Sequence, residues 1–297
     1  MKRNLNKLKN ALVVITLSAA IISCGRENTT EADETAVTDS VPAVPTETST
    51  QSYSLPSPLQ IAALFKRAGM KYIDGLTNSV SDVSKYSSNT SKAINLGIYS
   101  SDLAYCTVNK QNQPSINYLK ASRQLADQLG MGSVFEANNL STRFENNLSN
   151  EDSLTAIIAE LQMQTDIFME DNEQEHIAAT VFSGAWIESM YIGSKVYEKQ
   201  KDSKISMRLS EQMTILDNIL HVLNSYQAKD ESLKPLIADL TSVNDSYRNF
   251  PSVKAAITAA AADTTGDGEP GEITLTEQEL ASVSTKITEI RAKLVKG

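Results

Sequence analysis

Two acidic residues stand inside the two most apolar stretches of this 297-residue chain. Asp102 lies within residues 90–109 and Glu188 lies within residues 175–199, and both stretches are apolar on most sides at helical spacing. An unpaired carboxylate is costly to bury, so each acid must be partnered or protonated. Two such groups could serve as a general acid and a general base, or could bind a ligand.

Aromatic residues accompany both acids along the chain. If the two helices face each other, the acids and aromatic rings would line a pocket for a small ligand. The candidate ligand-binding residues are Tyr99, Asp102, Tyr105, Trp186, Glu188 and Tyr191. The alternative is structural, with the carboxyl groups bonded to hydroxyl groups or a lysine and setting the register of the helices. A filled core beside these helices would leave only helix surfaces for function.

The two histidines do not complete a recognisable metal site. Glu173 and His176 have the i, i+3 spacing of a di-iron bundle, but such a site needs a second pair. The other histidine, His221, has Asn218 at that spacing instead. Residues 263–274 faintly resemble a calcium loop but lack the bidentate glutamate that closes one. We predict no metal, no cofactor and no catalytic residue, with chemistry at the two buried carboxyl groups as the enzymatic alternative.

The first 24 residues have the pattern of an export signal. Four basic residues precede an apolar run over residues 11–22, and a small residue stands just before Cys24. The apolar run is shorter than the roughly 20 residues that a membrane span needs. Residues 21–24, Ile-Ile-Ser-Cys, resemble a bacterial lipobox. This resemblance implies cleavage before Cys24, a thioether-linked diacylglycerol on its sulfur and an acylated amino terminus, which together make a strong membrane anchor.

The residues after Cys24 indicate which membrane would hold the lipid anchor. Gly25 replaces the Asp that resembles an inner-membrane retention signal in enterobacteria, so outer-membrane attachment is favoured, on the periplasmic face or at the cell surface. The acidic residues over positions 27–34 resemble the charged segment of surface-exposed lipoproteins, although Arg26 comes first.

The net charge limits which partners the chain can bind, and the cysteine content limits which disulfides it can form. Loss of residues 1–23 removes four basic residues and no acid, which changes the formal charge from −9 to −13. Such an acidic chain lacks the clustered Lys and Arg that nucleic acid requires. Cys106 is the only cysteine besides Cys24, so we expect no internal disulfide and a buried Cys106.

The chain divides into a signal peptide (1–23), a tether rich in Thr, Ser, Glu and Pro (24–56) and an all-helical region (57–297). No stretch alternates with period two, so we predict an all-α bundle of about eight to ten helices, either one domain or two fused halves. Ser57-Pro58 marks the first helix start, and Thr276 with Glu279 forms a capping box for the last helix. Helical periodicity also runs through three further stretches, 71–87, 133–148 and 203–223. Alignment of Gly97 with Gly184 hints at an internal duplication.

Three segments carry a resemblance to known proteins. They are NLGIYSSDLAY (95–105), YLKASRQLADQLG (118–130) and GAWIESMY (184–191). Together they resemble an uncharacterised group of all-helical lipoproteins from Bacteroidota. The resemblance implies export and a helical architecture over most of the chain after the tether, and it implies no activity. We therefore expect a lipid-anchored envelope protein that binds or scaffolds another envelope protein through helical surfaces, with its oligomeric state open.

Overall fold

The computed structural model describes residues 56–262 and 273–297. Every regular element in these two ranges is helical and none is a strand, so the predicted all-α fold is confirmed. The predicted signal peptide, Cys24, nearly all of the tether and most of the candidate calcium loop lie outside the described residues. No helix in the described ranges is long and apolar enough to cross a membrane.

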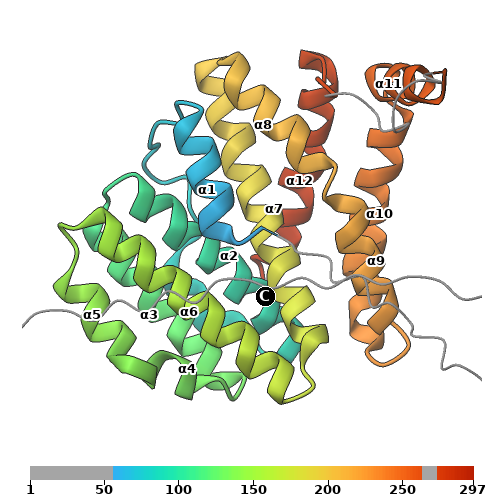
Figure 1. Cartoon of the computed structure of the whole chain (residues 1–297). Coiled ribbons are helices and arrows are strands. Elements are labelled where there is room, and N and C mark those ends of the chain that lie inside the picture. The colour runs from blue at the N-terminus through green and yellow to red at the C-terminus, as the bar shows by residue number, and fades with distance from the viewer. Residues whose placement is uncertain (1–55, 263–272) are drawn as a thin grey trace, which may run out of the picture. The chain divides into compact units, whose positions relative to one another are not determined.

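Figure 1 shows how the helices are arranged in the described residues. The α-helices are α1 (Pro58–Arg67), α2 (Asn89–Val108), α3 (Asn112–Gln128), α4 (Gly132–Glu136), α5 (Leu140–Asn146), α6 (Glu151–Asp171), α7 (Glu175–Gln200), α8 (Ser203–Met213), α9 (Leu216–Tyr226), α10 (Lys234–Asn249), α11 (Pro251–Ala262) and α12 (Glu277–Leu294). Three short 3-10 helices are η1 (Val80–Lys85), η2 (Ala137–Asn139) and η3 (Glu231–Leu233).

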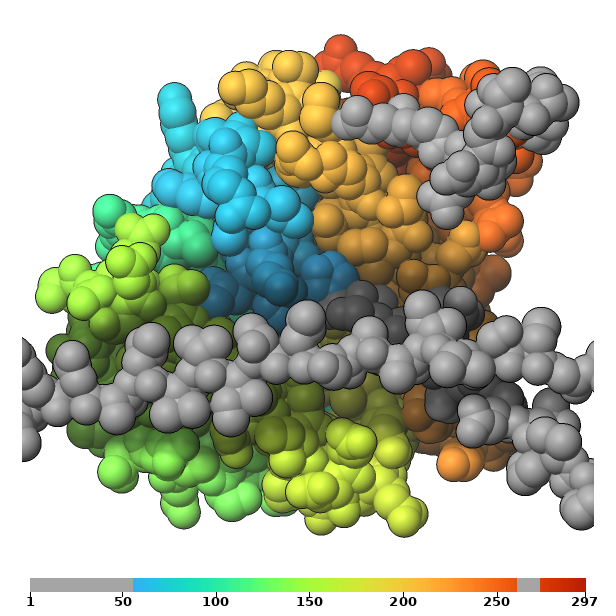
Figure 2. Space-filling model, in the orientation of Figure 1, coloured from blue at the N-terminus to red at the C-terminus, as the bar shows by residue number. Residues whose placement is uncertain are grey.

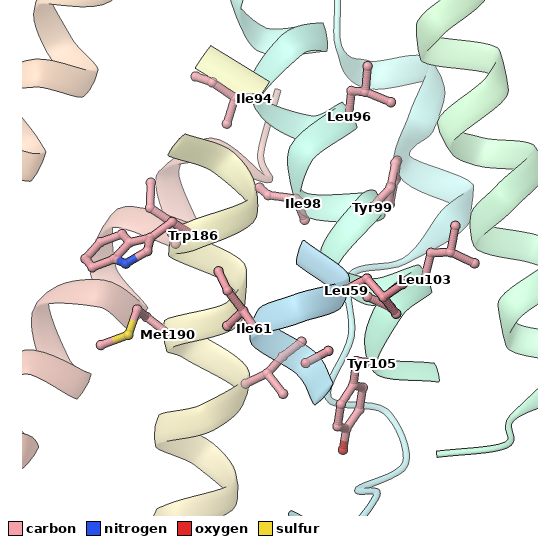
Figure 3. Close-up of a cluster of buried hydrophobic side chains, with 14 of the residues drawn as sticks. Leu59, Ile61, Ile94, Leu96, Ile98, Tyr99, Leu103, Tyr105, Trp186 and Met190 are labelled. Atoms are coloured by element: carbon pink, nitrogen blue, oxygen red, sulfur yellow. The ribbon is translucent and has the colours of Figure 1, made fainter. Parts of the chain in front are cut away.

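Helices α2 and α7 form the centre of the fold, and each packs more extensively on the other than on any other helix. Helix α3 covers another side of α2, while α8, α9 and α12 pack on α7, and α1 touches both central helices. In Figure 3, Ile61 of α1 lies between these helices, whereas Trp186 and Met190 point from α7 away from α2. Both central helices are therefore buried over most of their circumference, as their apolar sequences predict.

Two glycines bring the backbones of α2 and α7 into direct contact. A Cβ atom added at Gly97 would lie 1.8 Å from the carbonyl oxygen of Val181, and one at Gly184 would lie 2.0 Å from that of Ile94. Neither distance leaves room for a side chain, because these neighbours are backbone atoms rather than movable side chains. The two glycines that align in the sequence therefore meet at one helix crossing.

Residues 71–87 do not form the predicted helix. They run irregularly to η1, and Gly75 adopts a positive φ of 70°. Side chains of the core satisfy the backbone polar groups instead: the Tyr105 hydroxyl accepts the N–H of Ile73 (2.7 Å), and the Tyr118 hydroxyl donates to the carbonyl of Asn78 (2.7 Å). Tertiary hydrogen bonds thus replace the helical ladder here.

Two other predicted helices are each broken in two. Within residues 133–148, Asn138 and Asn139 have positive φ values of 51° and 53° and separate α4 from α5. Within residues 203–223, the chain turns after Met213 and divides α8 from α9. Asparagine tolerates the left-handed region better than most residues, and apolar periodicity alone does not reveal such a break.

The helix starts predicted at Ser57 and Thr276 are confirmed. Each hydroxyl accepts the backbone N–H three residues later, and the side chains of Gln60 and Glu279 bond back to complete both capping boxes. Cys106 is a buried free thiol, as expected.

Candidate functional site

The tertiary structure brings Asp102 of α2 and Glu188 of α7 together with a third residue, Arg291 of α12. The Arg291 guanidinium donates two hydrogen bonds to the Glu188 carboxylate, from Nε to Oε2 (2.5 Å) and from the terminal nitrogen to Oε1 (2.8 Å). Both acids are fully buried, and the Arg291 side chain is nearly so. In this three-residue cluster, called here the carboxyl–arginine cluster, a bidentate ion pair joins α12 to α7, and Asp102 of α2 lies beside Glu188.

A shared proton explains the contact between the two acids. The Asp102 and Glu188 carboxyl groups lie close enough to interact, and a hydrogen bond between them requires that one of the two carries a proton. Asp102 Oδ2 accepts the backbone N–H of Asn78 (3.1 Å), whereas Oδ1 is buried without a partner unless it carries the proton. Burial, and then the charge of Glu188, raise the pKa of Asp102 well above its usual value, although Arg291 opposes this shift.

The raised pKa of Asp102 predicts a pH dependence of folding. The folded state holds the Asp102 proton more tightly than the unfolded chain does, so this stabilisation is complete at low pH and is lost as pH rises through the folded-state pKa. Asp102→Asn, whose amide imitates the protonated acid, should remove this fall in the free energy of unfolding. Each unit of pKa shift corresponds to about 1.4 kcal/mol. Urea denaturation of the natural chain and of Asp102→Asn over a pH series measures how the free energy of unfolding of each depends on pH.

Asp74→Asn is the control for this comparison, because Asp74 is exposed. It should leave the pH profile of the natural chain unchanged. An Asp102→Asn profile parallel to that of the natural chain at every pH would contradict the assigned proton.

The six sequence-predicted residues do not line one pocket. Tyr191 belongs with the carboxyl–arginine cluster, because its ring centroid lies 4.1 Å from the Arg291 guanidinium. The other three aromatic residues bond to backbone groups rather than to the acids, although Tyr99 and Tyr105 reach the same 71–79 segment whose Asn78 N–H bonds to Asp102. The Tyr99 hydroxyl donates to the Ser79 carbonyl (2.8 Å), the Tyr105 hydroxyl binds the irregular 71–79 segment, and Trp186 Nε1 donates to the Gln212 carbonyl (3.2 Å).

The two acids of the carboxyl–arginine cluster are closed off from solvent, each at zero exposure. None of the six predicted residues lines the main surface hollows of the described residues. A general acid or base must come within hydrogen-bond reach of the proton it transfers, and no substrate reaches these two carboxyl groups in this arrangement. The cluster therefore acts on helix register and stability.

Sequence reasoning missed Arg291, although a signal for it exists. Arg291 follows Ile287 by four residues and precedes Leu294 by three, so it lies on the apolar stripe of the last helix. A basic residue on a buried stripe is the expected partner for buried acids elsewhere in the chain.

An extended hollow lies on a different part of the molecule. It is a groove of about 650 Å³ lined by α6, α7 and α9, with Ser57 and Gln60 at the start of α1 and Ser100 of α2 at its edge. A second hollow of about 610 Å³ continues it between α1 and α6, sharing Ser57, Gln60 and Ala159. The two hollows together are called here the α6 groove. Figure 2 shows the face of the molecule that carries α1 and α6.

Apolar side chains are exposed in the α6 groove. Met163 and Ile167, one turn apart on α6, are 51% and 45% exposed, and Ile257 on α11 is the other large apolar side chain of comparable exposure in the described residues. Phe182 of α7 and Val222 of α9 lie along the same groove. Exposed apolar residues that line one concavity are typical of a binding surface rather than of ordinary solvated surface.

The α6 groove was not identified from the sequence. A signal was present in Met163 and Ile167, two apolar residues four positions apart on α6 that fall outside the i, i+4 series of its buried positions Leu154 and Ile158. Which apolar positions remain uncovered depends on how the other helices pack.

The candidate metal pair does not acquire further ligands. Glu173 adopts a positive φ of 54° at the turn before α7, and the His176 ring lies beside that of Tyr226, with centroids 6.3 Å apart. Within residues 56–262 and 273–297, no three His, Cys, Asp or Glu side chains gather as metal ligands would.

Comparisons with known proteins found no similar protein. No family model, no curated protein and no solved structure matches this chain.

Proposed function

We propose that this chain is an exported, lipid-anchored protein of the cell envelope that binds another macromolecule through the α6 groove. The observation that carries the proposal is the exposure of Met163 and Ile167 in that groove. Leaving these side chains in water forgoes the free energy of burying them, about 25 cal/mol for each Å² of apolar surface. A partner that covers the groove would bury these side chains and so gain that free energy.

The anchoring part of the proposal rests on the first 24 residues. The basic start, the short apolar run and the Ile-Ile-Ser-Cys segment together predict export and lipidation at Cys24. A long polar tether would hold the helical domain away from the bilayer and leave its surfaces open to a partner. Outer-membrane attachment is the location that Gly25 favours.

Replacing Met163 and Ile167 together by Asp should abolish partner capture. Two charges on the groove floor would have to be desolvated by any apolar partner surface, which costs several kcal/mol. We expect affinity purification of the full lipidated chain from gently solubilised membranes to recover a stoichiometric envelope protein. The double variant should lose that protein, as quantified by mass spectrometry.

Ile257→Asp is the matched control, because Ile257 is 46% exposed on α11 and lies outside the α6 groove. It should capture the partner as the natural chain does. Equal capture by the double variant and the natural chain would show that binding occurs at another surface, and no captured protein at all would count against a binding role.

Cys24→Ala should remove the lipid and release the protein from the membrane fraction. The thiol is the acceptor of the diacylglycerol, and Ala has no atom that can replace it. Metabolic labelling with an alkyne-bearing fatty acid should mark the natural chain and leave the variant unlabelled. Cys106→Ala, which changes a buried thiol, should keep the label. Labelling of Cys24→Ala would contradict the assigned acceptor.

A further inference from the structure

The α6 groove has the length of a helix-binding surface. Its lining runs along α6 from Thr155 to Glu170, which is roughly 22 Å at 1.5 Å per residue. A partner helix of about four turns would match this length. Helix-in-groove recognition uses an apolar stripe at i, i+3, i+4 and i+7 spacing, and the groove presents apolar side chains from α6, α7 and α9 along its course.

The charged residues that line the part of the groove between α6, α7 and α9 are all acidic. Residues 144–194, which contain all of α6 and most of α7, include ten Asp and Glu and no Lys or Arg. Asp166, Glu170 and Glu175 line the part of the groove between α6, α7 and α9. None of these three forms a salt bridge with a described residue, whereas Glu160 on the same helix pairs with Arg143 (2.8 Å). The only basic residue along the groove lining is Arg67, at the α1 end.

An apolar groove with a free acidic rim selects for a particular occupant. Acidic peptides, nucleic acids and anionic lipid headgroups would meet like charge at the rim. An uncharged acyl chain could cover the floor but would leave the three carboxylates without a cationic partner, since Asp166 accepts a hydrogen bond only from the neutral Gln162 (2.8 Å). A helix with an apolar stripe flanked by Lys and Arg satisfies both features at once.

We propose that the α6 groove binds a basic amphipathic helix of a partner protein. This inference rests on the proposed binding function and adds the chemical class of the partner. The apolar stripe of the helix covers Met163, Ile167 and Phe182, and its flanking cations pair with Asp166, Glu170 and Glu175. Because rim charges lie near solvent, they contribute mainly to specificity and association rate, and the affinity should fall with added salt.

The test uses the full lipidated chain held in discs of zwitterionic lipid and two fluorescent 18-residue helical peptides. One peptide carries Leu at i, i+3, i+4 and i+7 with flanking Lys, and the other has Glu at every Lys position. Anisotropy titration, corrected against empty discs, should show the basic peptide binding at least about tenfold tighter than the acidic peptide. Asp166→Lys with Glu170→Lys should abolish that preference, while Asp245→Lys, on α10 away from the groove, should preserve it.

Three results separate this inference from the proposed function. Equal binding of both peptides that is lost with Met163→Asp and Ile167→Asp would keep the binding surface and overturn the basic class of the partner. The second result concerns dodecyltrimethylammonium, tested below its micelle concentration. If it displaced the basic peptide and bound as tightly as that peptide does, the inference that the partner is a helix would be overturned. Binding of the basic peptide that is unaffected by all groove variants would overturn both the inference and the groove.

Discussion

Arg291→Met is expected to lower the free energy of unfolding by about 3–5 kcal/mol. The substitution removes both hydrogen bonds to Glu188 and leaves a carboxylate, buried at zero exposure, without its cation. Removing one partner of a buried ion pair costs more than the pair contributes, because the remaining charge stays desolvated. Chemical denaturation of the purified chain, followed by circular dichroism, measures the loss.

Two further variants test the cause of that loss. Lys293→Met lies on the same helix and breaks only an exposed salt bridge to Asp239 (2.7 Å), so it should cost less than about 1 kcal/mol. Adding Glu188→Gln to Arg291→Met should recover part of the loss, since the amide needs no cation. If Arg291→Met proved as mild as Lys293→Met, the carboxyl–arginine cluster would not be a stabilising element of the core.

Gly97→Ala is expected to destabilise the fold by about 3 kcal/mol, at the upper end of what overpacking costs. The new methyl group would lie 1.8 Å from the Val181 carbonyl oxygen, so α2 and α7 would have to separate. The helix propensity of Ala, about 1 kcal/mol better than that of Gly, offsets only part of this cost. Thermal and urea denaturation should both show the decrease.

Gly132→Ala is the matched control for the glycine prediction. Its added methyl group would meet only the carboxylate of Asp127, a side chain that can rotate away, so the change should stay below about 1 kcal/mol. Gly184→Ala should resemble Gly97→Ala, and the double variant should cost less than the sum, because helices already separated accommodate the second methyl group. Additive losses would show that the two sites do not share one crossing.

The features predicted correctly from the sequence are those that short stretches specify. The helix starts at Ser57 and Thr276 depend on hydrogen bonds between residues three apart, so the residue types are sufficient to predict them. The burial of α2 and α7 follows from their apolar circumference, whichever helices cover them. The same local reasoning failed over residues 71–79, because the tyrosine hydroxyls that bond to that backbone come from α2 and α3.

The candidate site was predicted only in part. Burial of Asp102 and Glu188 was predictable, and so was the need for a partner or a proton. The predicted pocket required the aromatic residues to face the acids across an open space, whereas the side chains of Tyr99, Tyr105 and Trp186 bond to backbone groups in a filled core. A helix that is apolar all round gives no periodic signal for which side meets which neighbour.

The sequence by itself determined the helical class, many of the helix ends, the two central helices and the presence of two buried acids. The tertiary structure decided that these acids share one cluster with Arg291, 103 positions from Glu188, and that Gly97 and Gly184 meet at one crossing. It also decided that Met163 and Ile167 stay uncovered. The physical reason is the separation in sequence over which each interaction acts. Capping and helical hydrogen bonds join residues within about four positions of one another, so a short stretch specifies them. The partner of a buried charge and the uncovered side of a helix depend on contacts between distant segments.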